Sequence, residues 1–351
     1  MTIYRNINYS LKLIPATFLL VCLGLLFLKS GMAQDIHFSQ YYSAPLYTNP
    51  ANTGVLNGKL RFANDFRKQW SKLGMPINTF YSSFDTKLTL FNQNFGVGGF
   101  IVHDQATVYY LTTDEFKISL SYSKFIHNHQ FIVGIQPGYS FKSVYLEELT
   151  FGSQFNDVSH IFDRDIPNLE EGLSGNAGYF DMNIGIGWRA LVHNLMPSAG
   201  FSISHVSRPA VYFSSSSSSS YVPMKCMFNS QVAIPISNKF DLVPGVLYSS
   251  VPGSNELILG GSGGYSPEDI FIPVKRLYAT TMFRSNLFTD FDAMILGGGL
   301  AFPTFDLGIT YDINISPLRH ASNYHGAFEI SIVYNGRDLN KPDKNAPCFI
   351  Y

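Results

Sequence analysis

Apolar and polar residues alternate along residues 305–315, near the carboxyl end of the chain. The apolar positions are Phe305, Leu307, Ile309, Tyr311, Ile313 and Ile315, with polar residues or glycine between them. A period of two places all these apolar side chains on one face of a strand, which no helix can do. A strand in a soluble protein is usually about 5 to 6 residues long, whereas a tilted strand needs about 9 to 11 residues to cross a bilayer. The length of this segment therefore favours a membrane strand.

Similar segments recur from Lys59 to Asn335. They run approximately over residues 59–70, 77–90, 95–104, 112–125, 129–142, 180–192, 196–206, 224–236, 239–249, 256–263, 276–284, 291–300, 304–315 and 325–335. Bacterial single-chain barrels have an even number of strands, and closure in lipid leaves no strand edge unpaired. The sequence thus predicts an all-β fold, a transmembrane antiparallel β-barrel of about 14 strands.

Short and long connections alternate between these segments. Short links lie at residues 92–94, 127–128, 193–195, 237–238 and 301–303, and longer ones at residues 143–179, 207–223 and 316–324. Outer-membrane barrels have short periplasmic turns and longer outer loops, so the alternation predicts that both chain ends lie in the periplasm. The link from Gly264 to Lys275 is long where a short turn is expected. Either a strand is misplaced there or a periplasmic element is inserted.

The composition agrees with a barrel wall. The 351 residues are 46% hydrophobic, 15% aromatic and only 14% charged, with a mean hydropathy of +0.06; soluble domains average about 25% charged. A net charge of −1 gives no basic excess for binding phosphates, which argues against a nucleic-acid partner. Aromatic residues near strand ends are expected to form girdles at the membrane interfaces: Trp70, Tyr81, Tyr109, Tyr122, Trp188, Tyr248, Tyr278, Tyr311 and Tyr334.

Residues 1–33 have the features of a cleaved secretory signal. Basic residues, the last of them Lys12, precede an apolar run over residues 13–28, and Ala33 immediately precedes the expected cut. A retained anchor would need about 20 apolar residues, which makes it a weaker alternative. A lipoprotein signal at Cys22 is also weaker, because the preceding valine is larger than the usual small residue.

The rest of the chain divides into three parts. Residues 34–58 are rich in aromatic residues and proline and lack a clean period, so we expect an ordered irregular segment. It either plugs the lumen or packs under the periplasmic mouth. Residues 59–335 form the barrel, and residues 336–351 form a periplasmic tail. Cys226 and Cys348 either form a disulfide in an oxidising compartment or remain unrelated thiols.

Motifs that suggest catalysis have simpler structural explanations. Ser262 lies in a Gly-Gly-Ser-Gly-Gly sequence that matches the letters of a nucleophile elbow, but Pro267 follows where the elbow requires a helix. His205, which lies near several serines, is better explained as a histidine packed into the barrel wall. The sequence therefore predicts no catalytic residue and no cofactor.

Acidic and other charged residues have structural explanations as well. An acidic loop is expected to be solvated rather than to bind calcium, because its spacing does not match an EF-hand; it contains Asp163, Asp165, Glu170 and Glu171. Charges also recur on the polar faces of the strands: Arg61, Asp65, Asp85, Lys87, Asp181, Arg189, Asp306, Asp312 and Glu329. They would form either a selectivity filter or, as we favour, a paired polar network in a narrow lumen.

Several motifs resemble those of one protein family. They are Asp35-Ile36-His37-Phe38-Ser39-Gln40-Tyr41-Tyr42, Arg67-Lys68-Gln69-Trp70, Ser204-His205-Val206-Ser207-Arg208-Pro209, Tyr311-Asp312-Ile313-Asn314-Ile315-Ser316 and His325-Gly326-Ala327-Phe328-Glu329-Ile330-Ser331. They are similar to motifs of the PorP/SprF family of the type IX secretion system and gliding machinery of Bacteroidetes. His37 stands where the family often has proline, and Phe328 stands where a histidine precedes the glutamate. No metal or proton role is therefore carried over to these positions.

The resemblance implies a noncatalytic outer-membrane barrel in the export or retention of surface proteins with a type IX carboxy-terminal signal, such as gliding adhesins. It also implies contact with periplasmic lipoproteins or ring components of the machine. The outer loops 143–179 and 207–223 are expected to grip the cargo, because length and exposure are concentrated there. The alternative function is an outer-membrane channel or hydrophobic-solute transporter. A barrel lipase using Ser262 and His205 is a distant third.

Overall fold

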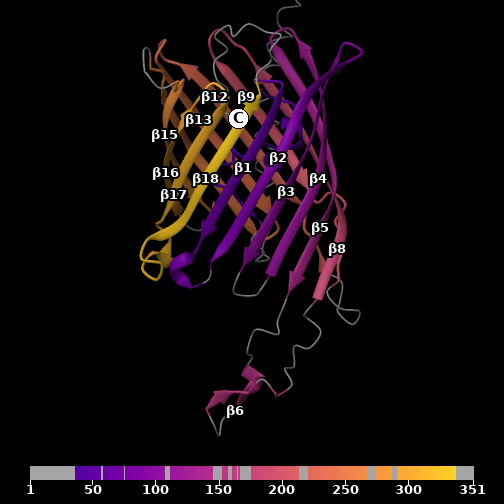
Figure 1. The fold of residues 1–351 in the computed structure, drawn as a ribbon, viewed down its shortest axis with the longest axis vertical. Coiled ribbons are helices and arrows are strands. Elements are labelled where there is room, and N and C mark those ends of the chain that lie inside the picture. Colours follow the sequence, from indigo (N-terminus) through magenta and orange to yellow (C-terminus); the bar gives the residue numbers. More distant parts are fainter. Residues whose placement is uncertain are drawn as a thin grey trace, which may run out of the picture.

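Fourteen antiparallel strands form one closed barrel, in the spatial order β1-β18-β17-β16-β15-β14-β13-β12-β9-β8-β5-β4-β3-β2 (Figure 1). The structure is a computed structural model and describes residues 36–56, 58–74, 76–106, 111–144, 152–156, 160–163, 165–166, 175–212, 220–267, 273–286 and 291–336. The predicted fold class, an antiparallel transmembrane barrel of about 14 strands, is confirmed.

Each segment predicted from the alternation overlaps one strand of the barrel. The strands are β1 (Leu60–Gln69), β2 (Ile77–Leu90), β3 (Gln93–Ala106), β4 (Leu111–Ile126), β5 (His129–Val144), β8 (Gly175–Ala190), β9 (Met196–Ser204), β12 (Lys225–Pro235), β13 (Phe240–Val251), β14 (Ser254–Tyr265), β15 (Arg276–Ser285), β16 (Phe291–Ala301), β17 (Phe305–Asn314) and β18 (His325–Gly336). Two small hairpins are separate from the barrel sheet: β6 (Phe155–Asn156) with β7 (Ile161–Phe162), and β10 (Ala210–Val211) with β11 (Ser220–Tyr221).

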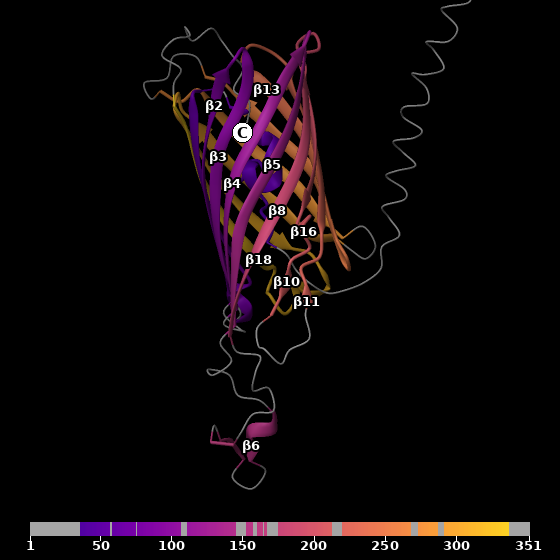
Figure 2. The same ribbon diagram turned by 90° about the vertical axis from the view of Figure 1, so that its right-hand side faces the viewer.

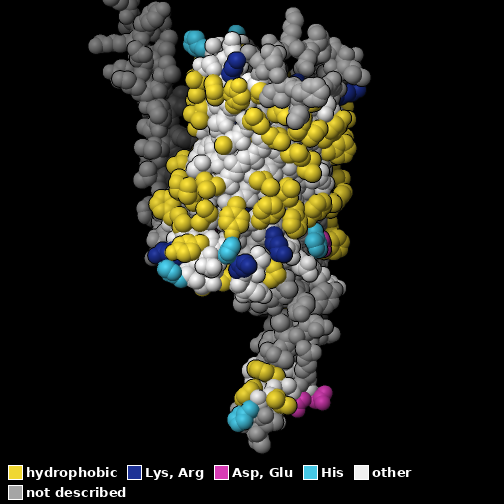
Figure 3. All heavy atoms as spheres, turned by 60° about the vertical axis from the view of Figure 1, so that its left-hand side comes forward, with side chains coloured by type: hydrophobic (Ala, Val, Ile, Leu, Met, Phe, Trp, Pro, Cys, Tyr) yellow, Lys and Arg dark blue, Asp and Glu magenta, His cyan; other side chains and the backbone are white. Residues whose placement is uncertain are grey.

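The alternation sorts side chains between the outer wall and the lumen. On β17, Ile309 and Tyr311 are 49% and 37% exposed on the outer face, whereas Asp312 is 0% exposed on the inner face. Figure 3 shows hydrophobic side chains over much of the barrel face that it draws. An apolar outer face and a polar inner face are the arrangement of a barrel that spans a bilayer. Among the described residues, no helix has the length and apolar character needed to cross a membrane.

The aromatic girdles are only partly as expected. Tyr311 and Tyr334 are exposed on the outer face, and Tyr122, Trp188 and Tyr248 occupy outward positions of their strands. Tyr109 lies outside the described residues.

The girdle prediction is wrong for Tyr81 and Tyr278. Tyr81 is fully buried in the lumen, where its ring centroid lies 5.8 Å from that of Phe38. Tyr278 shares the inward face of β15 with Arg276 and Thr280. Each tyrosine shares a face with charged residues of its strand, Tyr81 with Asp85 and Tyr278 with Arg276, so the alternation itself places both on the inner face.

The two ends of the barrel differ in their connections. We call the end that carries the links β5–β8, β9–β12 and β17–β18 the long-loop end, and the opposite end the short-turn end. Most links at the short-turn end are brief, as at residues 91–92 and 127–128. The link over residues 266–275 is long although the strands on both sides of it are as predicted, so it is an insertion. At the long-loop end, only Pro252 and Gly253 join β13 to β14, and Gly253 has a φ of +91° that favours glycine.

Residues 36–56, which we call the plug, lie inside the barrel (Figure 2). The plug contains α2 (Pro45–Thr48) and η2 (Pro50–Asn52). Its first described residue lies at the long-loop end, where the Ile36 carbonyl accepts a hydrogen bond of 3.0 Å from Lys225 Nζ at the start of β12. At the short-turn end the Lys59 backbone N–H donates to the Gly336 carbonyl at 2.8 Å.

The plug therefore runs through the lumen from the long-loop end to the short-turn end before the chain enters β1. Of the two expected positions for this segment, the lumen is correct and the periplasmic mouth is wrong. The prediction that both chain ends lie in the periplasm falls on residues outside the described ranges; among the described residues, Ile36 and Gly336 lie at opposite ends of the barrel. The signal and tail, residues 1–33 and 337–351, lie outside the described residues.

We expect Ile309→Arg to destabilise the barrel in lipid, by at most about 2–4 kcal/mol, because a guanidinium on the lipid-facing wall loses hydration. Urea unfolding in lipid vesicles, followed by the mobility difference between folded and heated protein on gels, measures this change. Ile309→Leu keeps the apolar surface and should unfold as the unaltered protein does. Equal stability of the two variants would contradict the placement of residue 309 against lipid.

Candidate functional site: the luminal plug and its polar network

Glu329 of β18 holds the beginning of the plug. Its two carboxylate oxygens accept the backbone N–H groups of Ser39 and Gln40 at 2.9 and 2.6 Å. Arg67 of β1 donates from Nη1 to the same carboxylate at 2.8 Å. Glu329 is 0% exposed, so these charge-assisted hydrogen bonds form away from water, where they are strongest.

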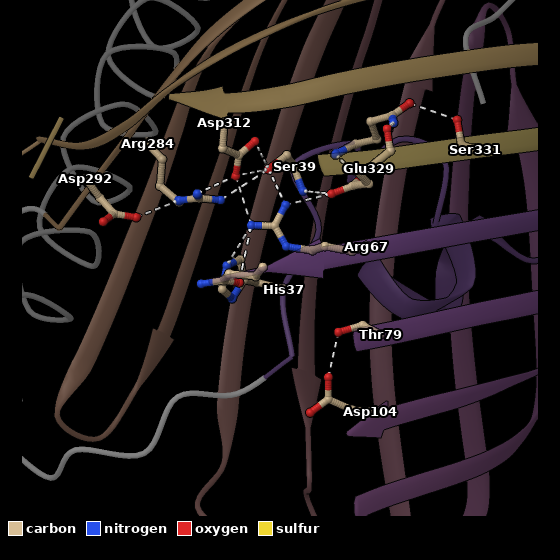
Figure 4. A network of polar contacts seen from close by, with 12 residues as sticks. His37, Ser39, Arg67, Thr79, Asp104, Arg284, Asp292, Asp312, Glu329 and Ser331 are labelled. Carbon is tan, nitrogen blue, oxygen red and sulfur yellow. Dashed lines mark hydrogen bonds and ion pairs between the residues drawn. The ribbon is translucent and has the colours of Figure 1, made fainter. Parts of the chain in front are cut away.

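Asp312 of β17 completes the network around the plug (Figure 4). The Ser39 hydroxyl lies 2.8 Å from both carboxylate oxygens of Asp312. Arg67 and Arg284 donate to Asp312 Oδ2 at 2.9 and 2.6 Å. Two guanidinium groups therefore balance the carboxylates of Asp312 and Glu329, and four different strands supply them.

The plug is one of the components that stabilise these buried charges. Arg67 and Arg284 also donate to the Ser39 hydroxyl oxygen, at 2.7 and 3.2 Å. Removing one partner of a buried charge network typically costs about 3–5 kcal/mol, because the remaining charge stays desolvated. The predicted luminal network of paired charges thus exists, and it includes a residue of the amino-terminal segment.

The end of the plug is held by a second ion pair. Arg61 and Asp85 form two parallel hydrogen bonds of 2.8 Å, and both side chains are completely buried. Asp85 Oδ2 accepts the Gly54 backbone N–H at 2.7 Å, and Arg61 Nη2 donates to the Asn52 carbonyl at 3.0 Å. Asp65, which also follows Arg61 on the inner face of β1, is buried, and neither carboxylate oxygen has a hydrogen-bond partner among the described residues.

Side chains of the wall satisfy the backbone in the middle of the plug. Gln136 Nε2 donates to the Leu46 carbonyl at 2.8 Å, and the Ser202 hydroxyl donates to the Thr48 carbonyl at 2.8 Å. Buried carbonyl groups need partners, and a segment with so little helix cannot supply them internally.

Two inward glycines allow the plug to approach the wall closely. A Cβ atom at Gly134 would lie 2.4 Å from the Pro50 carbonyl carbon, and one at Gly185 would lie 2.0 Å from Asn49 Oδ1. Both separations are too short for carbon, so side chains at these positions would displace η2. Glycine on the inner face of these strands is therefore a requirement of the plug.

Apolar contacts inside the lumen were not predicted from the sequence. Phe38 and Leu46 of the plug pack with Tyr81, Phe100 and Val102 of the wall. A signal for them exists, because Phe100, Ile101 and Val102 are consecutive apolar residues and place apolar groups on both faces of β3. A second cluster contains Tyr41 and Tyr42 with wall residues Leu247, Ile258, Met282 and Ile295.

His205 belongs to a separate buried cluster on the wall. Its Nδ1 lies 2.7 Å from Asp181 Oδ2, and Lys117 Nζ contacts the same carboxylate. The Ser207 hydroxyl donates to Asp181 Oδ1 at 3.2 Å rather than to the histidine, so this is not a serine–histidine pair. Ser262 lies within β14, where Val243 and Thr280 face it on the neighbouring strands, and not at an elbow.

The remaining predicted residues are dispersed. Lys87 and Arg189 line a cavity of about 570 Å³ at the short-turn end, and Asp306 accepts a 3.4 Å hydrogen bond from Asn335. Cys226 forms no disulfide with a described residue, and Cys348 lies outside the described residues, so the predicted alternatives for this pair stay open. Asp165 bonds through its backbone N–H to Asp163 Oδ1, whereas the other two acidic loop residues, 170 and 171, lie outside the described residues. No group of three His, Cys, Asp or Glu residues in the described ranges is placed to hold a metal.

An apolar outer wall around a lumen filled by an ordered segment defines a plugged outer-membrane barrel. Residues 30–334 match the model of the family described as type IX secretion system membrane protein PorP/SprF, and the protein therefore belongs to that family. Family and fold together assign it to the outer membrane, in the context of the type IX secretion machinery.

Solved structures of other barrels resemble this one in fold. The toluene transporter TbuX of Ralstonia pickettii is 9% identical with a TM-score of 0.50, and the alignment covers 88% of this chain and 95% of that chain. A FadL homologue of Pseudomonas aeruginosa is 9% identical with a TM-score of 0.46, covering 84% and 94% of the two chains. At this identity the likeness to TbuX shows the outer-membrane barrel fold alone. No curated protein sequence matches the chain.

Glu329→Ala should loosen the plug, because it removes the acceptor of two plug N–H groups and one of the two carboxylates bound to Arg67. We expect a loss of stability of about 3–5 kcal/mol and faster hydrogen exchange across residues 36–56. Hydrogen-exchange mass spectrometry of the detergent-solubilised barrel measures the second effect.

The matched control is Asp306→Ala, which removes an inward carboxylate that bonds to Asn335 rather than to the plug. Its exchange over residues 36–56 should equal that of the unaltered protein. Unchanged exchange in both variants would mean that the plug does not depend on Glu329.

Proposed function

We propose that this protein is a noncatalytic partner or anchor in the type IX secretion system, supporting the export and surface retention of a secreted adhesin-like protein. Family membership supplies the secretion context. The observation that carries the proposal is the plug, which two buried charge groups hold inside the lumen. Because the plug occupies the lumen, the outer wall and the loops are the surfaces that remain for partners.

The long-loop end supports contact with the cargo. There the β6–β7 hairpin stands away from the barrel (Figures 1 and 2). Its apolar side chains Phe155, Ile161 and Phe162 are 38%, 61% and 50% exposed. Exposed apolar surface of this kind is typical of protein interaction sites. We assign the carboxy-terminal signal domain of the cargo to this end, on the loops 143–179 and 207–223.

The short-turn end is the proposed site of contact with the periplasmic lipoproteins or ring components of the machine. The inserted link over residues 266–275, between β14 and β15, belongs to that end. In this proposal the chain reaches the outer membrane after cleavage of the signal at residues 1–33, and the cargo includes adhesins used in gliding.

Shortening the outer loops should abolish surface retention of the cargo while the barrel persists. We would replace residues 145–174 and 213–219 with short glycine–serine linkers, which leaves β5, β8, β10 and β11 intact. Surface cargo is measured by protease accessibility on whole cells, and barrel folding by heat-modifiable mobility. For comparison, replacing residues 266–275 at the opposite end, the proposed contact with the machine, should reduce export itself, so that the cargo stays in the periplasm. Normal cargo display by the loop-shortened protein would refute the assignment.

The alternative function is a channel or hydrophobic-solute transporter. The cavities at the two ends favour it, about 570 Å³ at the short-turn end and about 370 Å³ at the long-loop end. TbuX, which has a similar fold, is a toluene transporter. The plug lies between these cavities, and buried ion pairs of the wall hold it there, which favours the anchor function instead.

Conductance in planar bilayers discriminates between the two functions. We expect almost no ion current through the purified protein, because the plug is held by paired buried charges. The Glu329→Ala variant should conduct in brief openings, whereas Asp306→Ala should stay closed. Steady conductance or solute uptake by the unaltered protein would favour the transporter.

A further inference from the structure

One sector of the outer wall at the long-loop end combines basic and aromatic side chains. We call it the rim patch, and it consists of Lys68, Lys72, Arg319, His320 and His325. The first four are exposed and His325 is half-buried. Figure 3 shows lysine, arginine and histidine side chains along the rim just beyond the band of hydrophobic side chains.

Backbone contacts bring the two links that carry this patch together. The Trp70 N–H donates to the Gly326 carbonyl at 3.2 Å, which joins the β1–β2 link to the start of β18. The short helix η3 (Ser71–Leu73) contacts β18, and the link with η6 (Pro317–Arg319) leads into the same strand. In Figure 1 these two links lie beside each other at the long-loop end.

The rim patch has no acidic residue of its own. Residues 66–76 and 315–326 contain no Asp or Glu. Among the described residues, Lys68 and Lys72 form no salt bridge, and the Arg319 side chain makes one hydrogen bond, 3.5 Å long, to the Ile315 carbonyl. The patch is therefore a local excess of positive charge on a chain whose formal net charge is −1.

Outward aromatic residues set the level of the rim patch relative to the membrane. Lys68 is paired in register with Phe328, and Phe328 is paired with Tyr311 on the next strand. Phe328 and Tyr311 are 40% and 37% exposed, and the Tyr311 hydroxyl lies 2.5 Å from His325 Nδ1. Aromatic residues of membrane proteins gather at the level of the lipid headgroups. The adjacent cations thus lie at the level of headgroup phosphates.

We propose that the rim patch binds a phosphorylated glycolipid of the outer leaflet. Charge complementarity identifies the occupant, because the ammonium groups of Lys68 and Lys72 and the guanidinium group of Arg319 can bind phosphate. The aromatic side chains of the wall next to them can contact the acyl chains of the same lipid. The assignment to the outer leaflet follows from the long-loop end facing the cell exterior, as in other outer-membrane barrels. Lys68 directly follows Arg67, and Phe328 directly precedes Glu329. Neighbouring residues of a strand face opposite sides, so the lipid lies on the opposite side of the wall from the plug network.

Native mass spectrometry of lipid adducts tests this site. The probes are bisphosphorylated lipid A and the same lipid with both phosphates removed, each added to the purified full chain in detergent. We expect the bisphosphorylated form to bind and the dephosphorylated form to bind far more weakly. Combining Lys68→Gln, Lys72→Gln and Arg319→Gln should weaken binding by about fivefold per cation, on the order of a hundredfold together.

The control removes three cations from the opposite rim, Lys59→Gln, Lys124→Gln and Lys239→Gln, and should bind lipid A as the unaltered protein does. Heat-modifiable mobility checks that both variants remain folded barrels. Equal affinity of the two variants, or equal binding of the dephosphorylated lipid, would overturn the proposal. Stabilisation by inorganic phosphate alone would overturn it as well, since it would identify a free anion rather than a lipid as the occupant.

Discussion

The burial of charge in the lumen is the constraint on which the rest of this structure depends. Arg67, Arg284, Asp312 and Glu329 are at most 5% exposed, and a buried ion without its partners costs several kcal/mol. Ser39 lies among them and hydrogen-bonds to Asp312 and both arginines. The plug is therefore part of the charge balance of the wall, and its departure would leave buried charges with fewer partners.

The same network stabilises the closure of the barrel. β1 pairs with β18 along the whole length of β1, from Leu60 opposite Gly336 to Gln69 opposite Ala327. The hydrogen bond from Arg67 to Glu329 spans 262 residues of sequence. Bringing such distant segments together costs chain entropy. The backbone hydrogen bonds between β1 and β18 offset this entropic cost, and the charge-assisted bonds of Arg67 and Glu329 add to them. The barrel therefore closes at the same place where the plug is bound.

The wall could be predicted from the sequence because alternation is a local property. β2 begins and ends where the pattern predicts, at Ile77 and Leu90. The plug could not be placed in the same way, since its segment has no period and the bond from Ser39 to Glu329 joins residues 290 positions apart. The motifs containing Ser39, Asp312 and Glu329 were recognised separately, and nothing in their spacing indicates that they meet. The alternation of β2 places Tyr81 on the inner face, and the plug provides Phe38 as its apolar partner there.

A barrel wall is one strand thick, so its two faces are not independent. Phe328 faces outward, and the next residue, Glu329, binds the plug through both its side chain and its carbonyl, which accepts Gln40 Nε2 at 3.2 Å. Lys68 and Arg67 have the same relation on the paired strand. A contact that shifts the backbone from the membrane side must also shift the groups that hold Ser39 and Gln40. The seam between the first and last strands is thus the place where the membrane-facing wall and the plug are coupled.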